Sequence, residues 1–434
     1  MSASRRAAGV RFRPPPVAMT PELAWLLGRA FGPAGTPHDG AKLDGARVAA
    51  LADALDLAGR VAARQPPALL AAEIGEDAAA RLARRRHAVA AACLLAEALA
   101  VEVAGAAARL GVPLILLKGF SLHLAGRAPA GTRGFVDLDL LAPEDGARAL
   151  HAALAGEGFR VAAGPANEQH LPALAAPRWG ALDLHVRLRG VTLGGGGWAT
   201  AEELIGAGLC RPEPALPGDC RHLEPAVAAA HALTHGLDQH GWRPQSYRLT
   251  RMLADLLDLA GEDGPPALIA AAGERLAGAA TPGELTAVTR LLERLAAGRL
   301  PAGDDAAAAD PAEAGAAALL RHAVAGALDR RYAGSLRRRH LVHRLLEARR
   351  RGALGAYLAR KLAEPPVPPV GAADAEATPR TAEPAGVRAL DPEADPSAVA
   401  AAALGRGRLF ARLTALARAA YRRLPLNRRR PADR

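Results

Sequence analysis

The sequence predicts an α+β protein in which short strands of one sheet lie between two helical segments. The composition is rich in Ala, Leu and Arg and only 3% aromatic, which favours helices over sheets. Three segments depart from that helical pattern: residues 112–117 and 135–141 are short apolar runs, and residues 181–188 alternate apolar and polar side chains. At 434 residues, the chain is long enough for two or three domains with sizeable cores.

The first helical segment is predicted at residues 19–111, after a Pro-rich N-terminus, residues 1–18, that we expect to be disordered. Thr20-Pro21-Glu22 marks the first helix start, because Thr is a good N-cap and Pro is favoured at the first helical position. Amphipathic helices are then expected at residues 24–31, 43–64 and 78–110.

The cysteines and the N-terminus favour a cytoplasmic protein. Cys93, Cys210 and Cys220 form no even framework and no Cys-x-x-Cys pair, so we expect free thiols in a reducing compartment. The N-terminus carries basic residues without an apolar run, so no signal peptide is expected. Nor do we expect a membrane span, because Glu97 and Glu102 interrupt the most apolar candidate.

The strands are predicted to belong to a core at residues 112–190. Gly111-Val112-Pro113 breaks the preceding helix, and the short buried strand after it leads directly into a helix at residues 119–125. The rest of the core is expected to consist of a Gly- and Pro-rich loop, a strand at 135–141, a helix at 143–155, a strand at 158–161 and a strand at 181–188.

Two acidic side chains stand close together in the second strand of this core. Asp137 and Asp139 are separated by one leucine, so both carboxylates lie on one face of the strand, while Leu138 and Leu140 face the core. Like charges about 4 Å apart repel by about 4 kcal/mol at an effective dielectric near 20, unless a cation lies between them or one acid takes up a proton. A divalent metal ion with oxygen ligands is the simplest answer.

A third carboxylate arrives with the last predicted strand. Asp183, His185 and Arg187 share one face of the alternating segment, and the apolar residues share the other. In one sheet, Asp183 would join the two earlier aspartates. We expect His185 to be a partner of Asp183, or a semi-buried histidine with its own hydrogen bonds, rather than a metal ligand.

A C-terminal helical domain is predicted at residues 191–364. Its helices are expected at residues 225–239, 247–259, 266–276, 282–297, 311–330 and 336–362. Residues 365–397 are poor in apolar side chains and rich in Pro, Ala and acids, which indicates a disordered linker. Residues 398–434 return to a basic amphipathic helix and tail.

The positive charge of the chain is concentrated in that tail. The net charge is +11, and residues 397–434 contain ten arginines and one acidic residue. The body is therefore nearly neutral, which argues against nucleic acid as a partner of the core. The basic helix suits an anionic surface or an acidic partner protein.

The order of these motifs resembles the nucleotidyltransferases of the DNA polymerase β superfamily. Lys118-Gly119 stands at a strand-to-helix turn, Asp-x-Asp on the next strand and a single Asp on a later strand. The segments LILLKG, TRGFVDLDLLAP and DLHVRL are more particularly similar to a bacterial branch described as an uncharacterised nucleotidyltransferase family. The resemblance covers roughly residues 80–362.

This resemblance implies a small mixed-sheet nucleotidyltransferase core and a Mg²⁺-dependent transfer of a nucleoside monophosphate from an NTP, with release of pyrophosphate. The acceptor would be a hydroxyl-type group on a small molecule, peptide or protein. The catalytic and metal-binding residues would be Asp137, Asp139 and Asp183. The nucleotide-binding residues would be Lys118, Gly119, Ser121 and Arg133.

Other readings of the same residues stay open at this point. Phe120 occupies a position where the superfamily usually has a small residue facing phosphate. Asp137 and Asp139 could instead cap a strand end or pair with arginines, and Lys118 could be a solvated strand end. The alternative function is a non-catalytic nucleotide- or partner-binding module of the same fold.

Two histidines on a later helix have a spacing that suits zinc. His231 and His235 lie four residues apart, but no acidic or cysteine ligand accompanies them. We expect polar contacts between this helix and the active-site cleft instead. Arg251 and Asp255, also four apart, are expected to form an intrahelical ion pair.

Overall fold

A computed structural model describes residues 14–33, 41–135, 137–162, 169–177, 180–194, 197–239, 249–276, 278, 280–301, 310–329 and 331–336. The chain divides into two compact units, Met1–Glu364 and Pro365–Arg434, and every described residue belongs to the first. The predicted linker at 365–397 and basic helix at 398–434 therefore lie outside the described residues. The same holds for residues 1–13 and for most of the helix predicted at 336–362.

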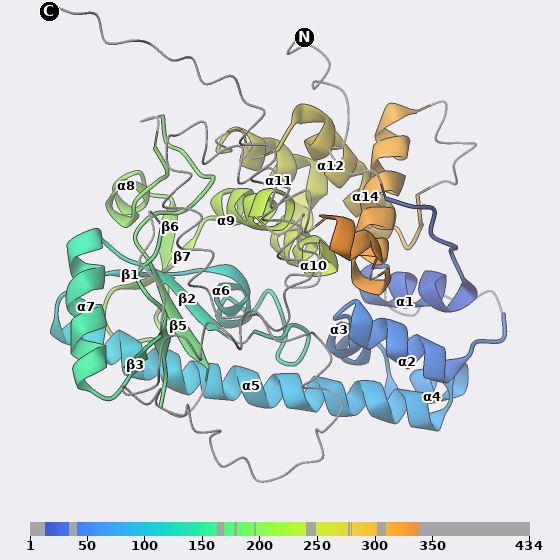
Figure 1. Cartoon of the computed structure of the whole chain (residues 1–434), viewed down its shortest axis with the longest axis horizontal. Helices are drawn as coiled ribbons and strands as arrows, with labels where there is room; N and C mark the ends of the chain where they lie inside the picture. The colour runs from blue at the N-terminus through green and yellow to red at the C-terminus, as the bar shows by residue number, and fades with distance from the viewer. Residues whose placement is uncertain are drawn as a thin grey trace, which may run out of the picture. The chain divides into compact units, whose positions relative to one another are not determined.

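A seven-stranded mixed sheet lies at the centre of this unit, with the order β3-β4-β5-β2-β1-β7-β6 (Figure 1). Strand β1 is antiparallel to the middle strand β2 and parallel to β7, and β2 is parallel to β5. The strands are β1 (Leu114–Leu116), β2 (Asp137–Leu141), β3 (Arg160–Val161), β4 (Leu174–Ala175), β5 (Ala181–His185), β6 (Cys210–Pro212) and β7 (Cys220–Leu223). The predicted α+β class is confirmed. Strands β6 and β7, however, lie in the part of the chain for which only helices were predicted.

The described part of the N-terminal segment forms five helices, α1 (Pro21–Phe31), α2 (Gly45–Ala54), α3 (Ala58–Arg64), α4 (Pro67–Ile74) and α5 (Glu76–Arg109). Thr20 caps α1, since its hydroxyl accepts a hydrogen bond from the Leu23 amide. The single helix predicted at 43–64 is divided into α2 and α3, because Asp56 takes a left-handed backbone conformation with φ of 56°. Helix α4 was not predicted.

Helix α5 joins the N-terminal helices to the sheet. It has 34 residues, so it extends about 51 Å, and it runs along one side of the molecule in Figure 1. One end packs on α2, α3 and α4, and the other contacts β2 and two further helices, α6 (Lys118–Leu124) and α7 (Glu144–Gly156). By length and composition alone α5 could cross a membrane, so the expectation that no segment would meet that test is wrong.

The remaining helices of the described residues follow β5 in the sequence. They are α8 (Ala201–Gly206), α9 (Pro225–Leu233) with a π-helical extension η2 (Thr234–Gln239), α10 (Leu249–Ala260), η3 (Gly261–Asp263), α11 (Gly264–Gly273), α12 (Pro282–Ala296) and α14 (Pro311–Leu328). Helices α9 to α14 correspond to predicted helices, whereas α8 was not expected.

Each face of the sheet packs into a different hydrophobic core. One core joins α5 and α7 to the alternate strand residues Leu114, Leu116, Leu138, Leu140, Leu182 and Leu184. The other core contains Ile115 and Leu141 from the opposite face, together with both the N-terminal helices and helices α9 to α14. The two helical segments that flank the sheet in the sequence therefore form one helical body.

Ion pairs connect the two ends of that helical body. The Arg60 guanidinium donates two hydrogen bonds of 2.8 Å to the Asp258 carboxylate. Arg251 on α10 pairs with Asp56 at the break between α2 and α3. The intrahelical pair predicted between Arg251 and Asp255 is therefore wrong, because both side chains bind partners from earlier in the chain.

Candidate active site

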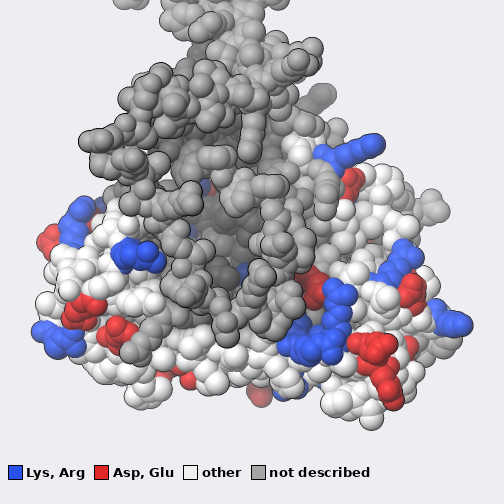
Figure 2. Space-filling model, turned by 60° about the horizontal axis from the view of Figure 1, so that its bottom comes forward, with Lys and Arg blue, Asp and Glu red and all other residues white. Residues whose placement is uncertain are grey.

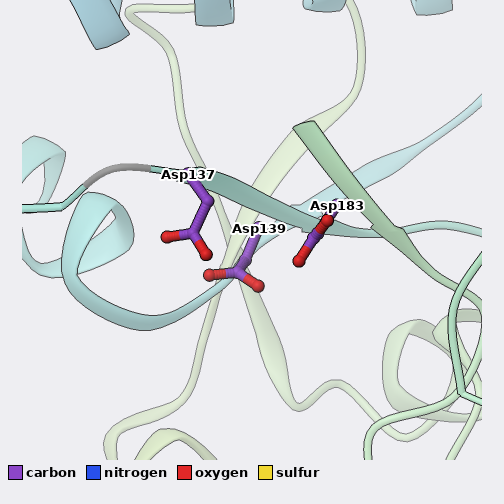
Figure 3. A group of neighbouring side chains, drawn as sticks. All are labelled: Asp137, Asp139 and Asp183. Carbon is purple, nitrogen blue, oxygen red and sulfur yellow. The ribbon is translucent and has the colours of Figure 1, made fainter. Parts of the chain in front are cut away.

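Three aspartates from two neighbouring strands meet on one face of the sheet (Figure 3). Strands β2 and β5 run parallel in a register that places Asp139 beside Asp183 and Leu138 beside Leu182. Asp137 lies two residues before Asp139 and so shares its face. Oxygen atoms of the three carboxylates lie within 4.8 Å of one another. The structure thus brings together the three aspartates that the sequence singled out.

Asp139 lies at the centre of this group and is almost fully buried. Its Oδ1 atom accepts a hydrogen bond of 2.6 Å from Lys118 Nζ and one of 2.9 Å from His185 Nε2. Burial alone would raise the pKa of Asp139, but the ion pair with Lys118 and the hydrogen bond from His185 hold that pKa well below its usual range. His185 therefore does not pair with Asp183, but the alternative expectation is confirmed, since it is a buried histidine with its own hydrogen bond. Lys118 is no solvated strand end.

Asp137 has the opposite electrostatic environment. Burial, followed by the neighbouring charge of Asp139, raises its pKa, and Lys118 only partly offsets this. The Asp183 carboxylate adds to the repulsion. Among the described residues, these three aspartates form the cluster of His, Cys, Asp or Glu side chains that could hold a metal ion. A hard divalent cation fits this donor set, since Mg²⁺ prefers carboxylate oxygens.

The turn between β1 and α6 has a constrained backbone. Lys118 has φ of 55°, in the left-handed region that non-glycine residues rarely occupy. At Gly119, an added Cβ would lie 1.5 Å from Nη1 of Arg133. Glycine is required there because the guanidinium of Arg133 fills the space next to its backbone.

Arg133 is held in that position by Asp255 of α10. Its Nε and Nη2 atoms donate hydrogen bonds of 2.6 and 2.9 Å to the two carboxylate oxygens, and both side chains are buried. The positive charge of Arg133 also lowers the pKa of Asp137. This pair joins the loop before β2 to the helical body.

The two residues after Gly119 have different surroundings: Phe120 packs in the core, whereas Ser121 lines a cavity. The Phe120 ring is 1% exposed and packs edge-on against Phe135, with ring centroids 5.7 Å apart. It therefore does not face the site, which removes the difficulty raised by its position in the sequence. Ser121 instead shares a hydrogen bond of 2.9 Å between its Oγ and Nδ1 of His222, and Nε2 of His222 bonds to Glu213.

A cavity of about 400 Å³ lies on the β7 side of the sheet, and it is linked to the aspartates by Lys118, which lines it and donates a hydrogen bond to Asp139. Its wall is formed by α6, β7, α9 and α10. The polar residues among those that line it include Lys118, Ser121, Arg127, His222, His231 and His235. Leucine and alanine side chains form the apolar part of the wall. This volume and mixed lining are typical of small-molecule sites.

Sequence reasoning missed Glu213 and His222 as parts of this site. They come from β6–β7, whose short segments show no clear apolar alternation, and β7 pairs with β1 across more than a hundred residues. His231, by contrast, was expected to contact the cleft, and it lines the cavity.

The described residues on one face of the protein carry mixed charge. Among the described residues on the face in Figure 2, blue and red residues stand near one another between white ones. This agrees with a nearly neutral body and gives the described part of that face no extended basic stripe.

Comparison with known proteins identifies one family. The family model described as an uncharacterised nucleotidyltransferase matches residues 41–263, just over half of the chain. The match begins and ends earlier than the resemblance expected at residues 80–362. No curated protein and no solved structure matches this chain.

Proposed function

Because the chain belongs to the uncharacterised nucleotidyltransferase family, we propose that it is an enzyme that transfers a nucleoside monophosphate from an NTP to a hydroxyl-type acceptor. The acceptor would be carried by a small molecule, a peptide or a protein. The observation that supports this most is the group of three carboxylates within 4.8 Å of one another on adjacent strands. A nucleoside triphosphate is itself negatively charged, so three carboxylates can bind it only through cations.

We assign the metal-binding role to these three aspartates and Mg²⁺ as the metal. Asp137 and Asp139 would hold one ion for the triphosphate, and Asp183 would contribute to a second. Bound there, Mg²⁺ would neutralise charge on the transferred phosphoryl group and make the acceptor hydroxyl more acidic. Asp183, at the edge of the group on β5, would then accept the hydroxyl proton.

Lys118, Gly119, Ser121 and Arg133 would form the nucleotide-binding part of the site. Lys118 Nζ, already 2.6 Å from Asp139, would approach the phosphates with its remaining donors. The Ser121 hydroxyl lines the cavity beside it. Arg133 is paired with Asp255, so its contribution would be to position Gly119 and the turn rather than to bind phosphate as a free cation.

The rival function is a binding module that holds a nucleotide or a partner without turnover. The unfavourable environment of Asp137 favours catalysis over this alternative. Groups whose pKa values are pushed apart within one cluster, as for Asp137 and Asp139 here, are more typical of reaction centres than of simple binding sites.

A labelling experiment separates the two functions. The full chain is incubated with Mg²⁺, each α-labelled NTP and cell extract, and transfer of label is compared with that of Asp137→Ala and of Asp145→Ala, an exposed residue on α7. We expect transfer by the wild type and the control only. If an NTP binds but neither label transfer nor pyrophosphate release occurs with any acceptor, the enzymatic proposal is wrong.

We also propose that the protein acts in the cytoplasm. Its three cysteines are free thiols, and burial raises the pKa of Cys210 and of Cys220 to about 11, which makes them poorly reactive. Free thiols of this kind suit a reducing compartment.

A further inference from the structure

His231 on α9 has one nitrogen with a partner and one without. Nδ1 lies 3.5 Å from the carbonyl oxygen of Arg189. Because a carbonyl only accepts hydrogen bonds, Nδ1 carries the proton, and Nε2 has a free lone pair. Nε2 is buried and has no hydrogen-bond partner among the described residues. The side chain is only 4% exposed, and it lines the cavity next to the three aspartates.

This imidazole cannot satisfy its lone pair by taking up a proton. Burial, and then the positive charge of Lys118, lower the pKa of His231 to about 3. A buried acceptor without a donor is rare in folded proteins and unfavourable. Here it lies on the last turn before the π-helical segment η2, and π-helical turns are frequent at functional sites. The geometry therefore calls for a ligand that donates a hydrogen bond.

The strand order decides which part of the reaction this cavity serves. Asp183, which would activate the acceptor, lies on β5, whereas the cavity is bounded by β7, on the other side of β2 and β1. Lys118 belongs both to the aspartate cluster and to the cavity wall. An acceptor that approaches from the β5 side leaves the β7 side to the nucleotide.

On the basis of the proposed transferase function, we propose that the cavity holds the nucleoside of the NTP. In this arrangement, Nε2 of His231 accepts a hydrogen bond from a hydroxyl group of the ribose. The ribose is joined directly to the phosphate that is transferred, so it must lie near the metal-binding end. His231 lines the same cavity as Lys118, and Lys118 donates a hydrogen bond of 2.6 Å to Asp139 of the metal-binding group. The apolar wall, with Leu122 and Leu259, is left for the base.

A site with a buried, otherwise unpaired acceptor discriminates strongly against ligands that lack the matching donor. A ligand without the hydroxyl leaves Nε2 unpaired in the complex, whereas the ribonucleotide does not. We therefore expect ribonucleotides to bind roughly tenfold to hundredfold more tightly than 2′,3′-dideoxynucleotides with the same base.

Equilibrium binding by calorimetry, with Mg²⁺ and the best-bound NTP, tests this on the full chain. The ribonucleotide and its 2′,3′-dideoxy form are compared on the wild type, on His231→Phe, which removes the lone pair at similar volume, and on His231→Gln, whose amide oxygen restores an acceptor. His87→Phe, an exposed position on α5, is the matched control. Discrimination should fall below about threefold in His231→Phe and return at least in part in His231→Gln. The separate 2′-deoxy and 3′-deoxy forms then show which hydroxyl is bound.

Equal binding of the two nucleotides by the wild type would overturn the inference, and this comparison requires no variant. Full discrimination retained in a folded His231→Phe would overturn the assignment to His231. Either result, with label transfer still present, leaves the transferase function standing. Absence of binding for every NTP would instead contradict both proposals.

Discussion

Replacing Asp137 by Asn should stabilise the protein without metal and destabilise it relative to the wild type when Mg²⁺ is present. Asn keeps the shape of the side chain but removes one of three negative charges whose oxygens lie within 4.8 Å of one another. Without a metal ion, Asp137 is the member of the cluster whose charge is least compensated, as its raised pKa shows. With a metal ion, it becomes a ligand.

The magnitude follows from that separation. Two unit charges 4.8 Å apart, the longest separation within the group, repel by about 3.5 kcal/mol at an effective dielectric of 20. Attraction to Lys118 and Arg133, which lower the pKa of Asp137, is lost as well. We expect a net gain of about 1–2 kcal/mol in the free energy of unfolding. At one hundred times its Kd, Mg²⁺ should stabilise the wild type by about 2.7 kcal/mol and reverse the order.

The difference between the two proteins should also depend on pH. Since the folded-state pKa of Asp137 lies above the usual 3.8, the folded state holds this proton more tightly than the unfolded state does. The destabilisation by Asp137 is therefore fully present above the folded-state pKa and disappears as the pH falls below 3.8. Without metal, the difference in the free energy of unfolding between Asp137→Asn and the wild type should therefore shrink as the pH falls over the same range.

Differential scanning calorimetry of both proteins, with EDTA and with saturating Mg²⁺, measures this reversal. Asp145→Asn on the exposed surface of α7 is the control and should follow the wild type in every condition. A variant that is less stable than the wild type in EDTA would refute the electrostatic reasoning. An undiminished Mg²⁺ effect in the variant would refute Asp137 as a ligand.

Two further substitutions test neighbouring interactions by urea unfolding in EDTA. Asp139→Asn should act in the opposite direction from Asp137→Asn and destabilise the protein by about 3 kcal/mol, because Lys118 and His185 lose the charged acceptor that both contact; a gain in stability would show that repulsion dominates at Asp139 too. Asp255→Asn should destabilise by about 3–5 kcal/mol, since it leaves the buried guanidinium of Arg133 without its bidentate partner; a change within about 0.5 kcal/mol would mean that this ion pair is dispensable.

Local patterns in the sequence were enough to place much of the fold and the three aspartates. Asp137 and Asp139 alternate with buried leucines, so their common face follows from the geometry of any strand. Helix α12 begins with a capping box of Thr281 and Glu284. The bounds of α5 and α12 agree with the expectation to within two residues.

Features that depend on distant residues could not be predicted in this way. The partner of Asp139 depends on the register between β2 and β5, which places His185 next to Leu141. Arg133 and Asp255 lie 122 residues apart, and the i, i+4 spacing on α10 suggested a nearer but wrong partner for Asp255. The strand β7 has only four residues, and it forms because it pairs with β1 rather than because its residues strongly favour a strand.

The shared core of the N-terminal and C-terminal helices has a consequence for synthesis on the ribosome. Arg60 and Asp258 are 198 residues apart, so at 5–20 residues per second the first helices wait roughly 10–40 s for the partner that covers them. During that time, apolar side chains of α1 such as Leu26 and Leu27, fully buried in the final structure, are exposed. The nascent chain should therefore be a good client for chaperones until α10 has emerged.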